Sequence, residues 1–333
     1  MKILFLSWSS YHRRSELLAQ HFGAKIFYVS YGKRGKLLDI LLKYPIQSLQ
    51  TWSILKKENP LVIFVQNPPI FCALVAYLYG KLFGSEYIID SHTGAFLDLK
   101  WRGFLGLHRW LSRRALTTIV HNNSQEEFMK AWKCPYCVIG YTPGNYPEGE
   151  PFPFQRQFNI AVISTYGDDE PLELIFEAAR CVPDVDFYIT GDDRQITPSL
   201  RKNKPENCYL TGYLSYSLYI GLLRHADSIM DLTTRDHTLL MGGFEAVSLG
   251  TPLITSDWPV LKEYFSLGTV HTSNTVEGLC ESVHYVKSNH ASLKQGMLRA
   301  QEMLQNEWEQ KYNELYSVIH HYEVNKSKND PYT

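Results

Sequence analysis

The sequence predicts an α/β protein with two doubly wound parallel sheets. Short apolar runs alternate with longer helical patterns throughout the 333 residues, which is typical of parallel strands joined by helices. With 44% hydrophobic residues the chain can bury two cores, so we expect two Rossmann-like domains of similar size facing a cleft. The expected strands form one series in each half of the chain: 2–6, 25–30, 61–66, 87–90, 117–121 and 137–140, then 158–163, 185–190, 209–211, 228–232, 252–255 and 269–271.

Helical patterns occupy the segments between these strands. A further pattern near the C-terminus is helical and polar on one side. The expected helices cover 15–22, 36–56, 70–83, 99–114, 124–132, 171–181, 216–224, 243–249, 259–265, 275–288 and 291–322.

A proline-rich segment separates the two halves. Four prolines and two glycines fall between residues 141 and 153, a composition typical of a linker. We therefore expect four parts: an N-terminal domain over 1–142, a linker over 143–157, a second domain over 158–310, and a C-terminal helix and tail over 311–333.

The formal net charge of -1 conceals a division along the chain. Residues 1–150 contain 18 Lys and Arg against 10 Asp and Glu, whereas residues 151–333 contain 15 against 24. A basic half joined to an acidic half indicates that the first half meets an anionic surface or acceptor. Uneven charge that serves only solubility remains an alternative.

The cysteines and the apolar runs favour a cytoplasmic protein with reduced thiols. The pair in Cys134-Pro135-Tyr136-Cys137 has the spacing of a dithiol redox site, but it follows a helical segment instead of opening one. A zinc site would need a second ligand pair, which is not evident. The longest apolar stretch, 61–83, is interrupted at 66–69 and is too short to span a bilayer.

The stretch 242–252, Gly-Gly-Phe-Glu-Ala-Val-Ser-Leu-Gly-Thr-Pro, predicts a ligand site. Gly242, Gly243 and Phe244 open a short helix, whose unpaired N–H groups and dipole favour a phosphate. We expect Glu245 in the first turn, where its carboxylate can accept hydrogen bonds from a diol such as a ribose. A tight turn that opens a packing helix is the alternative, because short glycine motifs are weak evidence.

This stretch resembles the glycosyltransferases of the GT-B fold, most closely family 4. Glu245-Ala246 and 250–252 match the second half of that family's Glu-x7-Glu motif, whereas His237 stands where the first Glu is usual. The resemblance implies a last helix that crosses back to the first domain. It also implies transfer of a hexosyl or related sugar from a nucleoside-diphosphate sugar to a hydroxyl, with retention of configuration and with no metal or cofactor.

Further donor-binding residues follow from the same resemblance. Gly191, with Arg194 nearby, corresponds to a turn next to the nucleotide. Gly212, Tyr213 and Leu214 correspond to the turn whose backbone contacts the base.

One group that the family usually has is missing from the second domain. The segment 164–170 is acidic where an Arg and a Lys would neutralise the departing diphosphate. Helix N–H groups, and Arg194, Arg235 or His237, are the remaining candidates for stabilising the leaving group.

In the first domain the resemblance places His92 at the donor sugar, after the strand at 87–90. Asp90 would anchor the loop or His92 itself. Asp98 and Trp101 are candidates on the acceptor side. A capping or core histidine, and a solvated carboxylate at a helix start, are the plain alternatives.

The segment 99–114 interleaves aromatic, leucine and basic residues. As one helix it would place Trp101, Phe104, His108 and Leu111 along one side, a pattern suited to an anionic membrane surface and equally to packing on the sheet. A second basic and apolar stretch covers 33–42. Peripheral membrane contact would fit a glycan or lipid-linked acceptor.

The sequence therefore predicts a glycosyltransferase of polysaccharide or glycolipid assembly. Two other interpretations stay open: a non-catalytic GT-B protein that binds nucleotide sugar or scaffolds a polysaccharide complex, and a sugar-nucleotide epimerase. Only the basic half favours nucleic-acid binding, which we do not expect. A nicotinamide dehydrogenase is disfavoured because 5–10 contains no Gly-x-Gly-x-x-Gly.

Overall fold

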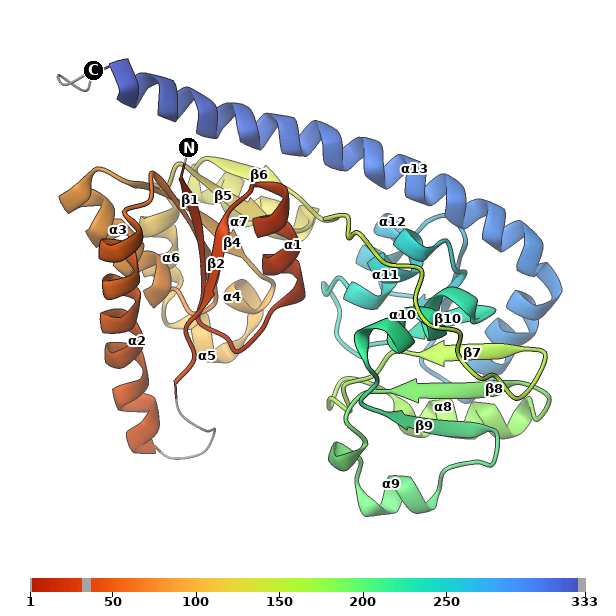
Figure 1. The fold of residues 1–333 in the computed structure, drawn as a ribbon. Coiled ribbons are helices and arrows are strands. Elements are labelled where there is room, and N and C mark those ends of the chain that lie inside the picture. Colours follow the sequence, from red (N-terminus) through yellow and green to blue (C-terminus); the bar gives the residue numbers. More distant parts are fainter. Residues whose placement is uncertain (1, 32–36, 329–333) are drawn as a thin grey trace. The chain divides into compact units, whose positions relative to one another are not determined.

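The computed structural model describes residues 2–31 and 37–328, without the side chains of 37–41. Its chain divides into two compact units, Met1–Thr142 with Glu307–Thr333, and Pro143–Asn306. Each unit contains a six-stranded parallel sheet with helices packed against it (Figure 1). The predicted architecture of two doubly wound sheets is confirmed.

The first sheet has the strand order β2-β1-β3-β4-β5-β6. Its strands are β1 (Ile3–Ser7), β2 (Lys25–Tyr28), β3 (Val62–Asn67), β4 (Glu86–Ser91), β5 (Thr117–Val120) and β6 (Tyr136–Val138). The helices are α1 (Arg13–His21), α2 (Leu37–Glu58), α3 (Phe71–Phe83), α4 (Gly94–Leu97), α5 (Leu99–Arg102), α6 (Leu105–Ser112) and α7 (Asn123–Trp132).

Continuous apolar runs form the central strands because both faces of the first sheet are covered. Leu4 and Leu6 of β1 belong to a core cluster that also contains the buried side chains of α3. Phe5 lies between them in the sequence and stacks on Phe64 of β3, whose ring also contacts Phe22 after α1. Alternate residues of one strand thus serve two opposite layers of helices.

The second sheet has the strand order β12-β11-β10-β7-β8-β9. Its strands are β7 (Asn159–Val162), β8 (Asp186–Thr190), β9 (Cys208–Gly212), β10 (Ser228–Asp231), β11 (Leu253–Ser256) and β12 (Thr269–Thr272). The helices are α8 (Leu172–Cys181), the 3-10 turn η1 (Asp193–Gln195), α9 (Pro198–Lys202), α10 (Tyr216–His225), α11 (Met241–Leu249), α12 (Pro259–Tyr264) and α13 (Val276–Lys328).

Helix α13 joins two helices that the sequence predicts separately, and it is kinked at Asn289, where φ is -120°. From Glu307 onward its residues belong to the first unit. There Trp308 packs on His21 with ring centroids 4.6 Å apart, and the Tyr322 hydroxyl donates to the Gly84 carbonyl at 2.9 Å. The expected return of the last helix to the first domain is confirmed.

One expectation about the helices needs revision. The single helix predicted over 99–114 is wrong, because α5 ends at Arg102 and α6 begins at Leu105, with a turn between them. The glycine in this turn, Gly103, lowers the helix preference at that point. Within the described residues, no helix combines the length and the hydropathy needed to cross a bilayer.

Replacing Trp308 by Ala should lower the free energy of unfolding by about 3–5 kcal/mol, as for other large buried side chains. Trp308 is 4% exposed, and its ring contacts those of His21 and Tyr312. Urea denaturation followed by circular dichroism measures the change. Asn306→Ala, at an exposed position two residues earlier, is the matched control. Equal stability of both variants would show that this end of α13 does not stabilise the first unit.

Candidate functional site

The polar residues of interest gather at the carboxyl ends of the strands, where ligands bind in doubly wound sheets. In the second unit these ends carry the turns after β8 and β9 and the connection from β10 to α11. In the first unit they carry the residues that follow β4 and β5.

A buried carboxyl group occupies the start of α11. Asp231, the last residue of β10, accepts hydrogen bonds from the backbone N–H groups of Gly242 and Gly243. A Cβ atom on Gly242 would clash with the Asp231 carboxyl group, so that side chain would have to move before another residue could stand there. The two N–H groups that the sequence analysis assigns to a diphosphate therefore already bind a protein carboxyl group.

Asp231 has an unusual protonation state. Its pKa is raised from 3.8 to about 8, chiefly by burial and in addition by the charges of Glu245 and Glu170, whereas the two glycine N–H groups act in the opposite direction. At neutral pH the group is therefore largely protonated, which limits the negative charge at the start of α11.

Glu245 lies in the second turn of α11, as its fifth residue, and not in the first turn as expected. Its side chain is buried, and its Oε2 atom accepts a hydrogen bond from the Tyr219 hydroxyl of α10 at 2.6 Å. Burial, followed by the Glu245 charge, raises the pKa of Tyr219 well above its usual value, which keeps the phenol a donor. Tyr219 was not predicted, because nothing in the spacing of α10 distinguishes it.

The two predicted glycine turns directly follow or end strands. Gly191 follows β8 with φ of +107°, and a Cβ there would lie 2.3 Å from the Ser164 carbonyl oxygen. Gly212 ends β9 with φ of +64°. Tyr213, next to it, is 89% exposed, which leaves its ring available to a planar ligand. Leu214 is half-buried.

The three basic residues predicted near the diphosphate are exposed, and each lies beside a carboxylate. Arg194 forms a bidentate contact with Asp192, with both N–O distances 2.7 Å. Arg235 lies 3.6 Å from Asp169, in the acidic loop after β7. His237 has φ of +58°, and its Nε2 atom lies 3.3 Å from Asp236.

The acidic loop after β7 is held by its own carboxylates. Glu170 accepts hydrogen bonds from the Ser164 hydroxyl at 2.6 Å and from the backbone and side chain of Thr165. Asp169 accepts a hydrogen bond from the Thr233 hydroxyl after β10, at 3.0 Å. Part of the negative charge predicted here therefore stabilises the loop.

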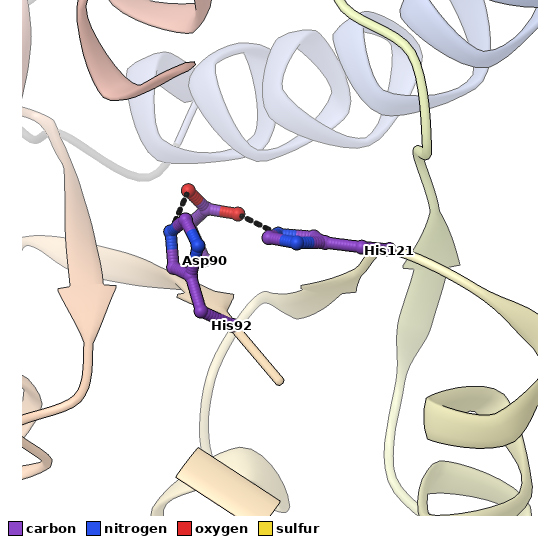
Figure 2. Close-up of side chains that lie close together, drawn as sticks. All are labelled: Asp90, His92 and His121. Carbon is purple, nitrogen blue, oxygen red and sulfur yellow. Dashed lines mark hydrogen bonds and ion pairs between the residues drawn. The ribbon is translucent and has the colours of Figure 1, made fainter. Parts of the chain in front are cut away.

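In the first unit, Asp90 holds two histidines (Figure 2). His92 donates from Nε2 to Oδ2 of Asp90 at 3.2 Å, and His121 donates from Nε2 to Oδ1 at 2.9 Å. Asp90 is fully buried, whereas the His92 ring is 16% exposed. The structure thus confirms the contact between Asp90 and His92 and adds His121, which the sequence analysis did not identify.

Two more side chains surround this cluster. The ring of His12, before α1, meets that of His92 edge to face with centroids 4.6 Å apart. Arg14 lies 3.8 Å from Oδ1 of Asp90, while its guanidinium also donates to the carbonyls of Ile139 and Gly140. Burial lowers the pKa of His12 to about 3, so its imidazole is neutral.

The two residues predicted on the acceptor side differ in their surroundings. Asp98 is exposed between α4 and α5. Trp101 is 8% exposed and packs among the rings of Tyr44, Phe71 and Phe104, so it is a core residue and not an accessible acceptor contact.

Most of the amphipathic side predicted for 99–114 packs inward. Like Trp101, both His108 and Leu111 are buried, and His108 shares hydrogen bonds with Ser91 and Asn67. Phe104, on the same predicted side, is 38% exposed. The predicted basic stretch at 33–36 lies outside the described residues.

Comparisons with known proteins agree with this architecture. Residues 167–315 match a family model described as glycosyl transferase-like. No curated protein sequence matches the chain. Sucrose-phosphate synthase from Thermosynechococcus elongatus has a TM-score of 0.73 at 12% identity, over 96% of this chain and 99% of that one.

Two other solved structures match similar shares of this chain and of their own. Anabaena HepE in complex with UDP and glucose has a TM-score of 0.73 at 12% identity, over 96% of this chain and 99% of that one. A putative UDP-N-acetylglucosamine 2-epimerase from Listeria monocytogenes has a TM-score of 0.57 at 13% identity, covering 89% and 91%. The fold is GT-B. At these identities the structural matches establish the fold alone.

The carboxyl group of Asp231 should make stability depend on pH. Its pKa is raised from 3.8 to about 8 in the folded chain, so the folded state holds a proton that the unfolded state releases. The free energy of unfolding should fall between pH 4 and pH 8 by at most about 1.4 kcal/mol per pH unit, and this contribution should be constant above that range.

Asp231→Asn should remove this contribution. Urea denaturation at pH 5 and pH 8 measures it, with Asp168→Asn at an exposed position as the control. A variant that keeps the pH slope of the unchanged chain would contradict the assignment.

Proposed function

We propose that this protein is a glycosyltransferase that moves a sugar from a nucleoside-diphosphate sugar to a hydroxyl acceptor. The observation that carries the proposal is the buried Glu245 on α11, inside the segment that matches a glycosyl transferase-like model. Anabaena HepE has been solved with UDP-glucose, which supports a donor of this chemical class. We further propose retention of configuration, as in family 4, and a role in polysaccharide or glycolipid assembly.

Glu245 would bind the nucleotide's ribose. A carboxylate can accept hydrogen bonds from both hydroxyls of a diol, and the Tyr219 hydroxyl at 2.6 Å already fixes one of its oxygens. The turns at Gly191 and Gly212, together with the exposed ring of Tyr213, would receive the rest of the nucleoside.

The diphosphate would depend on side chains more than on the start of α11. Asp231 accepts hydrogen bonds from the N–H groups of Gly242 and Gly243. Arg235 and His237 are therefore the better candidates for binding the phosphate oxygens. We propose no metal at the diphosphate and no organic cofactor.

His92 would act at the reacting sugar, with Asp90 holding its ring. In the transfer, the bond from the anomeric carbon to the phosphate oxygen breaks while the acceptor oxygen bonds to the same face of that carbon. The leaving phosphate oxygen takes the acceptor's proton. No protein nucleophile is then required, and the protein contributes positioning and charge stabilisation.

The acceptor would be a glycan or a lipid-linked glycan at an anionic membrane surface, with the protein on the cytoplasmic side. Leu99 is 81% exposed and is followed by Lys100, and the exposed Trp110 ring has the Arg114 guanidinium 4.1 Å from its centroid. Exposed apolar side chains beside cations suit such a surface.

A non-catalytic nucleotide-sugar-binding protein is the second candidate. The Asp231 carboxyl group, next to the start of α11, and the carboxylates of the acidic loop 164–170 lie where a diphosphate would be expected. Such a protein would bind nucleotide without turning over a donor.

Glu245→Ala should weaken binding of the matching nucleoside diphosphate by about 1.5–3 kcal/mol, the range for a hydrogen bond to a charged group. Calorimetric titration with UDP, GDP, ADP and dTDP identifies the base and measures the loss. Glu173→Ala, at an exposed position on α8, is the control and should leave affinity unchanged. If no nucleotide binds the unchanged chain, the donor site is wrong.

His92→Ala should lower the rate of nucleotide release from the donor sugar roughly 10²-fold, the scale for losing one transition-state contact. Its affinity for the free nucleotide should stay within about twofold, because the proposed nucleotide contacts all lie in the second unit. Coupled assay of released nucleotide and calorimetry separate the two effects. An unchanged rate would exclude His92 from the reaction, and the absence of turnover in the unchanged chain with every donor would favour the non-catalytic protein.

A further inference from the structure

We propose that Asp90, His92 and His121 form a binding site for one divalent transition-metal ion of the zinc or cobalt class. The site lies within the first unit, and its three side chains are the group of potential ligands found among the described residues. His92 is also the residue placed at the sugar in the proposed transfer, but all three ligands lie in the first unit, so metal binding can be measured without a donor.

The topology of the sheet brings the three ligands together. Strands β4 and β5 are parallel neighbours, and Asp90 pairs in register with Ile119. His92 directly follows β4, and His121 directly follows β5, so both imidazoles start from the same edge of the sheet. Asp90 lies between them, as Figure 2 shows.

The donor atoms have a suitable chemistry and separation. One ligand atom from each residue lies within 4.8 Å of the other two. The two Nε2 atoms lie 3.2 and 2.9 Å from the Asp90 carboxylate oxygens. Ligands of a tetrahedral zinc ion stand roughly 3.3–3.6 Å apart, so a small opening of the cluster would admit the ion. Two imidazoles and one carboxylate are a donor set that zinc, cobalt and iron accept.

The protons of the two imidazoles have to move when a metal binds. A neutral imidazole binds a metal through the ring nitrogen that carries no proton, whereas Nε2 of His92 and of His121 donates to Asp90. Metal binding at Nε2 would shift each proton to Nδ1 of the same ring and would replace the two hydrogen bonds to Asp90 by bonds to the ion.

A buried amide fixes the loops that carry the ligands. Gln125 is 2% exposed; its Oε1 accepts the backbone N–H of His121 at 2.8 Å, and its Nε2 donates to the Thr93 hydroxyl at 2.8 Å. The backbone N–H of His92 donates to the Asn67 carbonyl at 2.8 Å. Such supporting contacts orient ligands before the metal arrives and increase its affinity.

Three protein ligands leave a coordination position for another group, as in catalytic zinc sites. The His92 ring is the accessible member of the cluster at 16% exposure. Arg14 offsets the charge of Asp90 at 3.8 Å, so the occupied site keeps a net positive charge. An anionic oxygen, such as hydroxide or a carboxylate, is therefore the expected additional ligand.

Titration of the full chain with Co²⁺ after treatment with a chelator tests the site. Tetrahedral Co²⁺ bound to imidazole and carboxylate gives intense visible absorption, and calorimetry with Zn²⁺ gives the stoichiometry. We expect one equivalent to bind, with affinity reduced at least about tenfold in both His92→Asn and His121→Asn. The double variant His320→Asn/His321→Asn, on the exposed end of α13, controls for binding to surface histidines and should behave as the unchanged chain.

Two results would overturn the proposal. One is the absence of a stoichiometric ion in the unchanged chain, which would leave the cluster as a hydrogen-bonded support for His92. The other is binding that both cluster variants retain. Because His121 is buried, His92→Asn at the more accessible position keeps the test decisive if His121→Asn does not fold. The titrations contain no nucleotide, so their failure is distinguishable from failure of the proposed transferase activity.

Discussion

Both units depend on one constraint of parallel sheets, that the strands of a sheet end at one common edge. Backbone groups at that edge are no longer satisfied by the ladder, and polar side chains supply the missing partners. Asp90 stands near the end of β4 and Asp231 at the end of β10, and both are buried there. Each carboxyl group links its strand to residues of the following connections. The candidate functional residues of each unit lie around its carboxyl group.

The two aspartates show how neighbouring groups set protonation at equivalent positions. Both are buried, and burial alone would raise both pKa values. Asp90 accepts hydrogen bonds from two imidazoles, so its pKa falls well below the usual value. For Asp231 the charges of Glu245 and Glu170 add to the effect of burial, so its pKa rises to about 8. The first group suits cation binding and ring orientation, whereas the second serves as a nearly neutral cap on α11.

Periodicity in the sequence was sufficient for the sheets, because central strands buried on both faces appear as continuous apolar runs. Periodicity did not separate α5 from α6, because the apolar pattern continues through the turn that divides the two helices. Glu245 was predicted from a sequence motif and not from periodicity, whereas Tyr219 was not predicted, because the contact between α10 and α11 is a tertiary property. His121 was missed for the same reason: 31 residues separate it from Asp90, and only the pairing of β4 with β5 brings them together.

The start of α11 limits how the diphosphate of a donor could bind. A helix N-terminus attracts an anion through its unpaired N–H groups, but Asp231 binds those of Gly242 and Gly243. A protonated Asp231 leaves the helix dipole largely uncompensated, so a diphosphate can still gain from the dipole without direct hydrogen bonds to these two groups. Its oxygens then need separate donors, and Arg235 is a suitable cation because it is 63% exposed and held only at 3.6 Å by Asp169. In the proposed donor site, Arg235 would exchange its ion pair with Asp169 for one with the ligand, and it would then contribute more to phosphate binding than the glycines that suggested the site.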